Sequence, residues 1–137
     1  MICFFDTNVL VYCMDAGDPL RQARAIERLE QASAQGKVVL SAQVLQEFYA
    51  ITTRKLRPAL SPAEAREQVE RLASFEVIGS SAASVLEATR LADRHQLQWW
   101  DALILEAALR AGADILVTED GQHGQRFGRL SVENPFL

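Results

Sequence analysis

The chain has 137 residues, 49% of them hydrophobic and 23% charged, with seven glycines and four prolines. This composition is typical of one globular domain and excludes disordered and collagen-like chains. No apolar run approaches the roughly 18 residues of a membrane span, and the apolar start of the chain lacks the basic lead of a signal peptide. We therefore expect a cytoplasmic protein with no membrane partner. Because the formal net charge is −4, any nucleic-acid binding must depend on a local cluster of cations.

The cysteines and histidines argue against two common kinds of site. Cys3 and Cys13 are too few for a disulfide framework or a four-thiolate zinc centre. We expect both as reduced thiols in the interior. His95 and His123 are far apart in the chain, which also argues against a His-rich zinc centre.

Short apolar runs alternate with helical segments along the whole chain. The expected strands cover residues 2–5, 37–40, 75–78 and 114–118, with a candidate fifth over 130–132. The expected helices cover residues 20–35, 42–56, 62–74, 99–111 and a segment that starts at 81 or 84 and ends near 95, with a helical turn over 8–14. This alternation, without repeats or linkers, predicts a single α/β domain over residues 1–137. We expect three layers, in which helices flank a mostly parallel sheet of four or five strands.

Helix boundaries are marked by capping residues and prolines. Asp18 followed by Pro19 is a helix start signal, and Ser61 with Glu64 three residues later forms a capping box. Pro58 prevents the preceding helix from continuing.

Two of the expected strands end directly in acidic residues. Asp6 follows the first strand, and Glu119 and Asp120 follow the fourth. In α/β sheets of this kind, ligands and catalytic groups collect beyond the carboxyl ends of the strands. Asp6 has a second interpretation, as the N-cap of the following helix, and its position is equally compatible with that role.

Two further carboxylates lie on helices in apolar company. Glu47 flanks an apolar stripe that contains Val44 and Ile51, although a solvated Glu at the edge of such a stripe is the simpler interpretation. Asp101 falls on the same helical face as Ile104 and other apolar residues. An ionised carboxylate on such a face is costly unless it is paired or binds a metal. The alternative for Asp101 is an N-cap of a helix that would begin one residue later.

The four acids gain meaning as a set, because they come from separate elements of one fold. Carboxylates gathered within ~5 Å repel one another by about 3 kcal/mol per pair at an effective dielectric constant near 20. They therefore need a compensating cation, and an all-oxygen site suits Mg²⁺ or Mn²⁺. Such an ion supports phosphodiester hydrolysis. The sequence contains no P-loop, G-x-G-x-x-G motif or Ser/His/Asp arrangement that would indicate a different chemistry.

The ordered set of motifs resembles the PIN-domain ribonucleases, in particular the VapC-type toxins of bacterial toxin–antitoxin pairs. The likeness covers essentially the whole chain. The matching segments are Phe4-Phe5-Asp6-Thr7-Asn8-Val9-Leu10, Ser41 through Gln46-Glu47-Phe48-Tyr49, Trp100-Asp101-Ala102-Leu103-Ile104, Leu116-Val117-Thr118-Glu119-Asp120, Gly121-Gln122-His123-Gly124 and the terminal Asn134-Pro135-Phe136.

The resemblance implies a fold, an activity and a set of roles. It implies a single Rossmann-like PIN domain and a Mg²⁺-dependent endoribonuclease that leaves a 5′-phosphate and a 3′-hydroxyl, with Mn²⁺ as a substitute ion. Asp6 and Asp101 match the acids that hold the ion most directly, and Glu47 and Asp120 match the other two. These acids would be oriented by hydrogen bonds with residues that do not contact the ion themselves: Thr7, Asn8, Thr118 and Glu119. Glu119, a second acid beside Asp120, leaves open which of the two faces the ion.

The resemblance also implies partners: RNA as substrate, a cognate antitoxin protein and a second copy of the chain in a homodimer. For RNA contact, Arg54, Lys55 and Arg57 form the densest basic cluster. An equally good interpretation is that these cations complement the dipole at the end of the helix that precedes them. Arg126 and Arg129 are weaker candidates.

Two other functions start from the same residues. A phosphatase of the HAD type also has an apolar first strand that ends in Asp and also uses Mg²⁺. It requires D-x-D, however, and Asn8 occupies the second acidic position. A non-catalytic binding module with the same fold and a degenerate acidic site is the other alternative, against which stands the presence of all four acids.

Overall fold

The computed structural model describes residues 1–137 and confirms the predicted alternation of strands and helices. The strands are β1 (Ile2–Phe5), β2 (Lys37–Ser41), β3 (Glu76–Ile78), β4 (Ile115–Val117), β5 (Arg126–Phe127) and β6 (Leu130–Glu133). The helices are α1 (Thr7–Tyr12), α2 (Pro19–Gln35), α3 (Ala42–Arg54), α4 (Pro62–Leu72), α5 (Ala82–His95) and α6 (Trp99–Arg110). None of these helices combines the length and the apolarity needed to cross a membrane.

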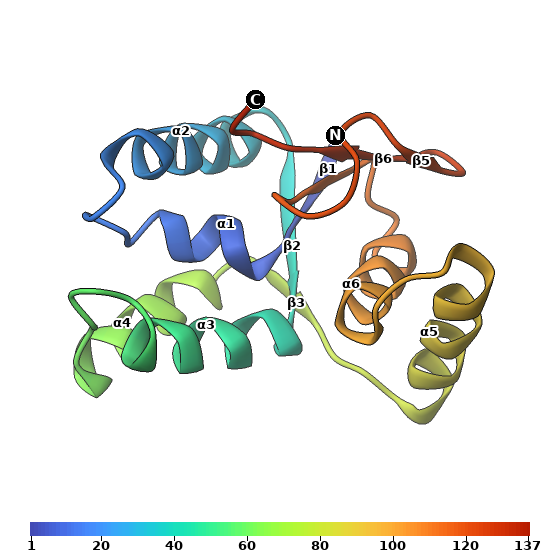
Figure 1. The fold of residues 1–137 in the computed structure, drawn as a ribbon, viewed down its shortest axis with the longest axis horizontal. Coiled ribbons are helices and arrows are strands. Elements are labelled where there is room, and N and C mark those ends of the chain that lie inside the picture. Colours follow the sequence, from blue (N-terminus) through green and yellow to red (C-terminus); the bar gives the residue numbers. More distant parts are fainter.

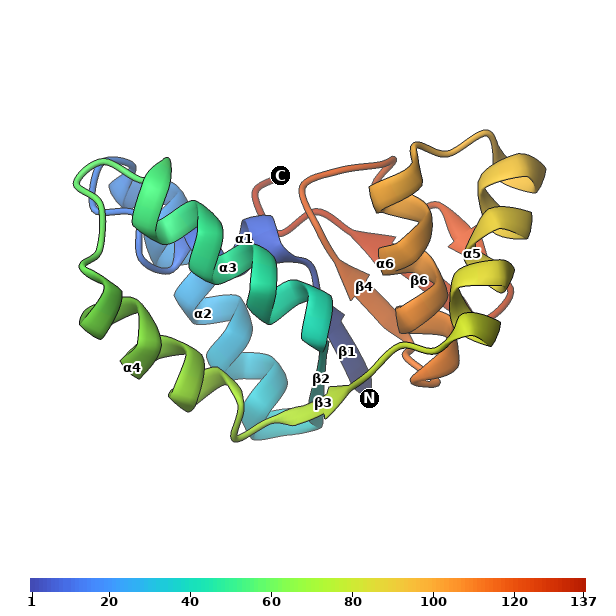
Figure 2. The same cartoon turned by 90° about the horizontal axis from the view of Figure 1, so that it is seen from below.

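The strands form one sheet in the order β3-β2-β1-β4-β6-β5. All neighbours run parallel except β5, which pairs antiparallel with β6. Helices α1 to α4 lie on one side of the sheet, and α5 and α6 lie on the other (Figures 1 and 2). The chain builds outward from β1 through β2 to β3, and then returns to place β4 on the free side of β1. The strand order therefore reverses between β1 and β4, which is where sheets of this class bind ligands.

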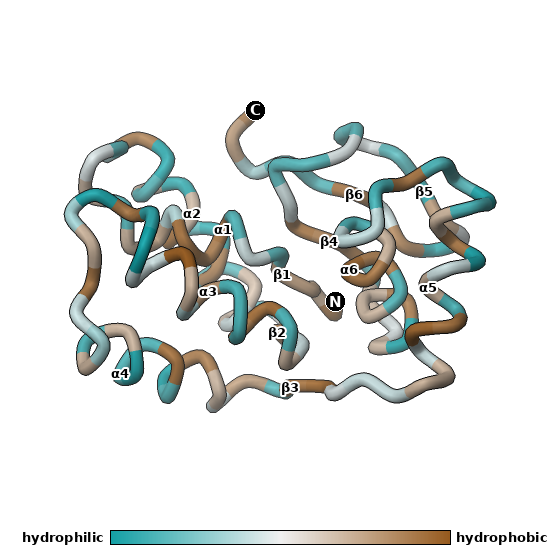
Figure 3. Tube along the Cα trace, turned by 60° about the horizontal axis from the view of Figure 1, so that its bottom comes forward, coloured by the Kyte–Doolittle hydropathy of each residue, from teal (hydrophilic) through white to brown (hydrophobic).

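The sheet is the centre of the hydrophobic core. Phe4, Phe5 and Val39 on the strands and Phe48 on α3 are fully buried, and the hydrophobic colour in Figure 3 runs through the strands between the helix layers. Burying side chains of this size contributes roughly 1.5–3 kcal/mol each. Cys3 and Cys13 are buried free thiols, as predicted. This core fixes the strand ends, and with them the residues that follow.

The capping signals of the sequence are confirmed in detail. Asp18 accepts a hydrogen bond from Arg21 N at the start of α2, and Ser61 and Glu64 form a reciprocal capping box on α4. Of the two candidates for the start of α5, Ser81 is the N-cap and Ser84 completes its capping box.

One prediction about the elements was wrong. The sheet has six strands and not four or five, because the two residues of β5 form a short hairpin partner for β6. A strand of two residues, flanked by exposed polar residues and glycine, has no hydrophobic period that a sequence pattern could reveal. Helix α6 begins at Trp99, as predicted, after Gln98, so Asp101 lies in the first turn of the helix and the alternative interpretation of Asp101 as an N-cap is excluded.

Candidate active site

The carboxyl ends of β1 and β4 lie side by side and bring two acidic segments together. Phe5 pairs with Val117 across the two strands, and the Asp6 backbone N–H donates to the Val117 carbonyl at 2.9 Å. Directly beyond this pair, the Thr118 hydroxyl donates to Asp6 Oδ2 at 2.7 Å. The parallel register therefore places Asp6 and the segment after β4 at the same edge of the sheet, at the point where the strand order reverses.

A small cavity opens at this edge and is lined by carboxylates from three elements. Asp6 comes from the end of β1, Asp101 from the first turn of α6 and Asp120 from the turn after β4. The other lining residues are Leu97, Ile104, Leu105, Leu116, Thr118, Gly121, Gln125, Phe127 and Val132. No Lys, Arg or His lines the cavity, so the three acids have no positive partner in it. Its volume of about 70 Å³ suits an ion with a few waters and not an organic cofactor, whose pockets measure roughly 300 Å³ or more.

Asp6 combines both roles that its position suggested. Its side chain is only 8% exposed, and Oδ1 caps α1 by accepting from the Thr7 backbone N–H at 2.7 Å. Burial, with smaller contributions from the negative charges of Asp120 and Glu47, raises the pKa of the Asp6 carboxyl to about 6, against the hydrogen bonds from Thr118 and Thr7, which lower it. Asp6 is thus a helix cap whose free charge is costly, as a cation-binding carboxylate would be in the absence of its ion.

Asp101 and Asp120 line the same cavity as Asp6. Asp101 is partly buried, and this burial, together with the charge of Asp120, raises the pKa of its carboxyl. Asp120 is exposed but fixed at both ends. Its backbone N–H donates to the Thr118 hydroxyl oxygen at 3.0 Å, and the Asn8 side-chain amide donates to its Oδ2 at 3.0 Å. Asn8 therefore supports the acidic set, and no second acid stands two residues after Asp6, as the phosphatase alternative would need.

Glu47 stands beside the cavity and does not line it. Its Oε1 accepts a hydrogen bond from the Thr7 hydroxyl at 2.9 Å and a longer one from Gln43 Nε2 at 3.5 Å. Since Thr7 directly follows Asp6, this bond ties α3 to the end of β1. The structure thus brings three of the four predicted acids into one cavity and places the fourth next to it.

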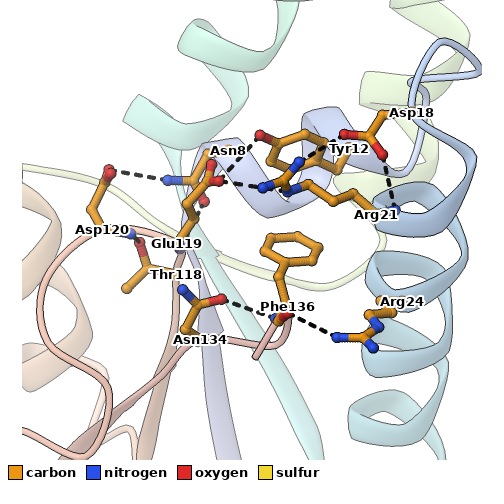
Figure 4. Close-up of polar contacts among 10 residues, drawn as sticks. All are labelled: Asn8, Tyr12, Asp18, Arg21, Arg24, Thr118, Glu119, Asp120, Asn134 and Phe136. Atoms are coloured by element: carbon orange, nitrogen blue, oxygen red, sulfur yellow. Dashed lines mark hydrogen bonds and ion pairs between the residues drawn. The ribbon is translucent and has the colours of Figure 1, made fainter.

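Glu119 points away from the cavity, although it is adjacent in sequence to Asp120. Its carboxylate accepts a hydrogen bond from the Tyr12 hydroxyl at 3.2 Å and lies 3.8 Å from Arg21 Nε (Figure 4). Its backbone N–H donates to Asn8 Oδ1 at 3.3 Å. The sequence interpretation missed Tyr12 and Arg21. The only sequence signal for Tyr12 is its spacing of four residues from Asn8, which puts both on one face of α1.

The predicted basic cluster divides into two parts. Arg57 donates to the carbonyl oxygens of Arg54 and Leu56 at 2.9 and 3.1 Å, so its guanidinium completes the end of α3. Arg54 and Lys55 are exposed and form no side-chain hydrogen bond or ion pair. Of the two weaker candidates, Arg129 pairs with Asp114 at 3.1 Å.

The carboxylate oxygens of the cavity suit a hard divalent cation, but they do not form a complete coordination shell for it. Carboxylate oxygens are the ligands that Mg²⁺ and Mn²⁺ prefer. No three His, Cys, Asp or Glu side chains are arranged so that together they could hold a metal ion. An ion at this site would therefore take one or two of the carboxylates directly and fill its remaining positions with water, which is the usual way proteins hold Mg²⁺.

Comparison with solved structures finds the same fold in several toxin–antitoxin proteins. A chain of VapBC2 from Rickettsia felis, bound to a promoter DNA fragment, has a TM-score of 0.70 at 21% identity, with 98% of each chain covered. A toxin–antitoxin complex from Klebsiella pneumoniae gives 0.72 at 20% identity, with 97% of each covered. The sarcin–ricin loop cleaving toxin VapC20 of Mycobacterium tuberculosis gives 0.63 at 22%, with 83% of this chain and 86% of that one covered.

By sequence, no curated protein matches this chain significantly. The PIN domain family, in contrast, matches over residues 3–128, a range that includes β4, α6, all of β1 except Ile2, and all four predicted acids. With the sheet order and the acidic cavity, this match shows that the chain belongs to the PIN domain family.

Proposed function

We propose that this protein is a metal-dependent endoribonuclease and the toxin of a toxin–antitoxin pair. One observation carries the proposal: one small cavity is lined by three carboxylates from separate elements, those of Asp6, Asp101 and Asp120, and by no Lys, Arg or His side chain. Membership of the PIN domain family supports the same assignment. The fold shared with VapC toxins, one of which cleaves the sarcin–ricin loop, supports it as well.

In this proposal, Asp6 and Asp101 hold a Mg²⁺ ion, for which Mn²⁺ substitutes. Asp120 completes the negative side of the cavity, and Glu47 acts from its rim. When bound, the ion supplies an activated water and neutralises charge that develops on the phosphoryl group. Thr118 and Thr7 keep the Asp6 carboxylate in one orientation through bonds of 2.7 Å each. A carboxylate held in this way needs little reorganisation when the ion arrives.

RNA contact outside the cavity falls to Arg54 and Lys55, the two free cations of the basic cluster. Arg54 is seven residues after Glu47 on α3, so both side chains belong to the same face of the helix, about 10 Å apart along its axis. In this proposal the RNA backbone runs from the acidic cavity past Glu47 towards Arg54. Positive charge outside the cavity would bind phosphate without competing with the ion.

The antitoxin would bind at the same edge of the sheet. The structures from Rickettsia felis and Klebsiella pneumoniae are toxin–antitoxin assemblies with this fold. A cavity of three carboxylates also suits an arginine side chain from a partner, which would form charge-assisted hydrogen bonds in place of the ion. We place the protein in the cytoplasm, where such a partner and RNA are both present.

A homodimer stays a prediction. Exposed hydrophobic side chains gather on the α5 and α6 side of the molecule, where Leu86 is 56% and Trp100 is 62% exposed. Such a surface is typical of a contact between subunits. Sedimentation or light scattering of the purified protein would measure its mass directly.

An RNA cleavage assay tests the proposed function. The purified protein should cut RNA in Mg²⁺ or Mn²⁺, and Asp6→Asn, Asp101→Asn and EDTA should each abolish cutting. Activity that survives both substitutions, or EDTA, would refute the proposal. Mn²⁺ calorimetry separates the non-catalytic binding module from the enzyme, because a degenerate site would bind no ion.

A further inference from the structure

Glu119, the residue before Asp120, holds the turn that carries Asp120 through contacts outside the cavity. Glu119 accepts from the Tyr12 hydroxyl and lies 3.8 Å from Arg21, while Asp120 accepts from Asn8 (Figure 4). Two consecutive acids thus have different partners: Glu119 is held by Tyr12 on α1 and Arg21 on α2, and Asp120 by Asn8 on α1.

Arg21 is itself fixed from several sides. Its guanidinium lies 5.6 Å from the centre of the Tyr12 ring and 5.9 Å from that of Phe136, within the range of cation–π attraction. The two rings contact each other edge to face at 5.0 Å. Asp18 holds the guanidinium at 3.0 Å. These partners restrict the Arg21 guanidinium on the side that faces Glu119.

The last residues of the chain take part in this arrangement. Phe136 donates its backbone N–H to Asn134 Oδ1 at 2.9 Å, and its carbonyl accepts from Arg24 at 2.8 Å. The Asn134 backbone N–H donates to Nδ1 of His123, which lies in the loop after β4. The C-terminal segment is therefore tied both to α2 and to the loop that follows Asp120, and it brings the Phe136 ring to Arg21.

We infer that Arg21 and Tyr12 are positioning residues for Asp120, and that Glu119 transmits their effect and does not itself bind the ion. This inference rests on the proposed function, because it assigns Asp120 to the cation site. The Tyr12 phenol suits the role, since a phenol with an ordinary pKa near 10 stays a donor at neutral pH, and burial and the bond to Glu119 raise this pKa further.

Electrostatics alone predicts the opposite effect of removing Arg21. Loss of a positive charge near an acidic cavity makes the site more negative and should strengthen cation binding. Loss of a positioning contact, in contrast, frees the Thr118–Asp120 turn and should weaken cation binding. The sign of the change in metal affinity therefore distinguishes the two roles, and thermal unfolding shows separately whether each variant is folded.

The experiment is Mn²⁺ binding by calorimetry on the full chain. Arg21→Met and Glu119→Ala should each raise the Mn²⁺ dissociation constant about tenfold, the lower end of what supporting residues contribute. Tyr12→Phe keeps the ring and should have a smaller effect of the same sign. Glu119→Gln keeps an acceptor for both partners and should stay close to the unaltered protein, whereas Asp120→Asn should bind weakly.

Two comparisons complete the design. Arg71→Met removes an equal charge from an exposed ion pair with Glu67 on α4 and should leave Mn²⁺ affinity unchanged. The double variant Arg21→Met with Glu119→Ala should bind no more weakly than Glu119→Ala alone, because Arg21 acts through Glu119.

The outcomes separate the inference from the function on which it rests. Unchanged or tighter Mn²⁺ binding by a folded Arg21→Met variant would overturn the positioning role. A loss in Glu119→Gln as large as that in Asp120→Asn would overturn it too, since Glu119 would then be a ligand. An unaltered chain that binds no Mn²⁺ would instead refute the proposed metal site, and the positioning role with it.

Discussion

The Thr118 hydroxyl donates to the Asp6 carboxylate at 2.7 Å and so joins the end of β4 to the end of β1. The same oxygen accepts the backbone N–H of Asp120 at 3.0 Å. One buried threonine therefore sets the orientation of one acid and the start of the turn that carries another. The acidic cavity depends on this link between two residues that are 112 positions apart in sequence.

Asp6 should make the ion-free protein less stable as the pH rises. Its folded pKa of about 6 lies above its ordinary value near 4, so the folded state binds more protons than the unfolded state between these values. The free energy of unfolding therefore falls as pH rises from about 4 to 6, by on the order of 3 kcal/mol from this group.

Other carboxyl groups contribute their own pH dependence, so the test compares two proteins. Without divalent ions, Asp6→Asn should be more stable than the unaltered chain at pH 7.5, and the difference should shrink toward pH 4. Chemical unfolding at several pH values measures it. Equal pH profiles of the two proteins would contradict the raised pKa of Asp6.

Replacement of Thr118 should move the pH dependence of activity. In Thr118→Val the Asp6 carboxylate loses a hydrogen bond that lowers its pKa, so the acidic limb of the rate profile should shift to higher pH. Loss of the hydrogen bond from the Asp120 N–H should also cost stability, about 0.5–1.5 kcal/mol. Thr118→Ser keeps the hydroxyl and should behave like the unaltered protein; a Ser variant that shifts as far as the Val variant would rule out the hydrogen bond as the cause.

Divalent ions should stabilise the folded chain. An ion that binds only the folded state adds about 2.7 kcal/mol to the free energy of unfolding at a hundred times its dissociation constant. Millimolar Mn²⁺ should therefore raise the melting temperature, EDTA should reverse the rise, and Asp101→Asn should reduce it. A melting temperature that does not respond to Mn²⁺ would argue against a cation in the acidic cavity.

The basic cluster should separate into RNA-binding and structural residues. In the inactive Asp101→Asn background, Arg54→Ala and Lys55→Ala should weaken RNA binding and lower its salt dependence by about 0.7 per lost phosphate contact. Arg57→Ala should instead lower the unfolding free energy by roughly 0.5–1.5 kcal/mol, because it loses contacts with helix carbonyls. If all three variants bind RNA like the parent protein, the cluster serves only the end of α3.

The sequence pattern was sufficient for the fold because each strand and helix carries its own local signal. The apolar run at residues 2–5 and the capping box at Ser61 and Glu64 specify their elements without tertiary information, and both are confirmed. β5 carries no such signal, because two residues form a strand only where β6 offers them an edge.

The site could be predicted in part, for a related reason. Strand ends locate Asp6 and Asp120 from topology alone, and helical periodicity directs Asp101 toward the same edge. The choice between Glu119 and Asp120 depends on Tyr12 and Arg21, about a hundred residues earlier in the chain. Only the packing of α1 and α2 against the turn after β4 brings these partners to Glu119, and no local pattern records it.

A crystal of the protein grown with Mn²⁺ tests the central claim most directly, since anomalous scattering locates the ion independently of any assumed ligand. We predict one strong peak inside the cavity formed by Asp6, Asp101 and Asp120, with water completing its coordination and Glu119 still bonded to Tyr12. An empty cavity at saturating Mn²⁺, or a peak bound by Glu119 in place of these carboxylates, would contradict the account.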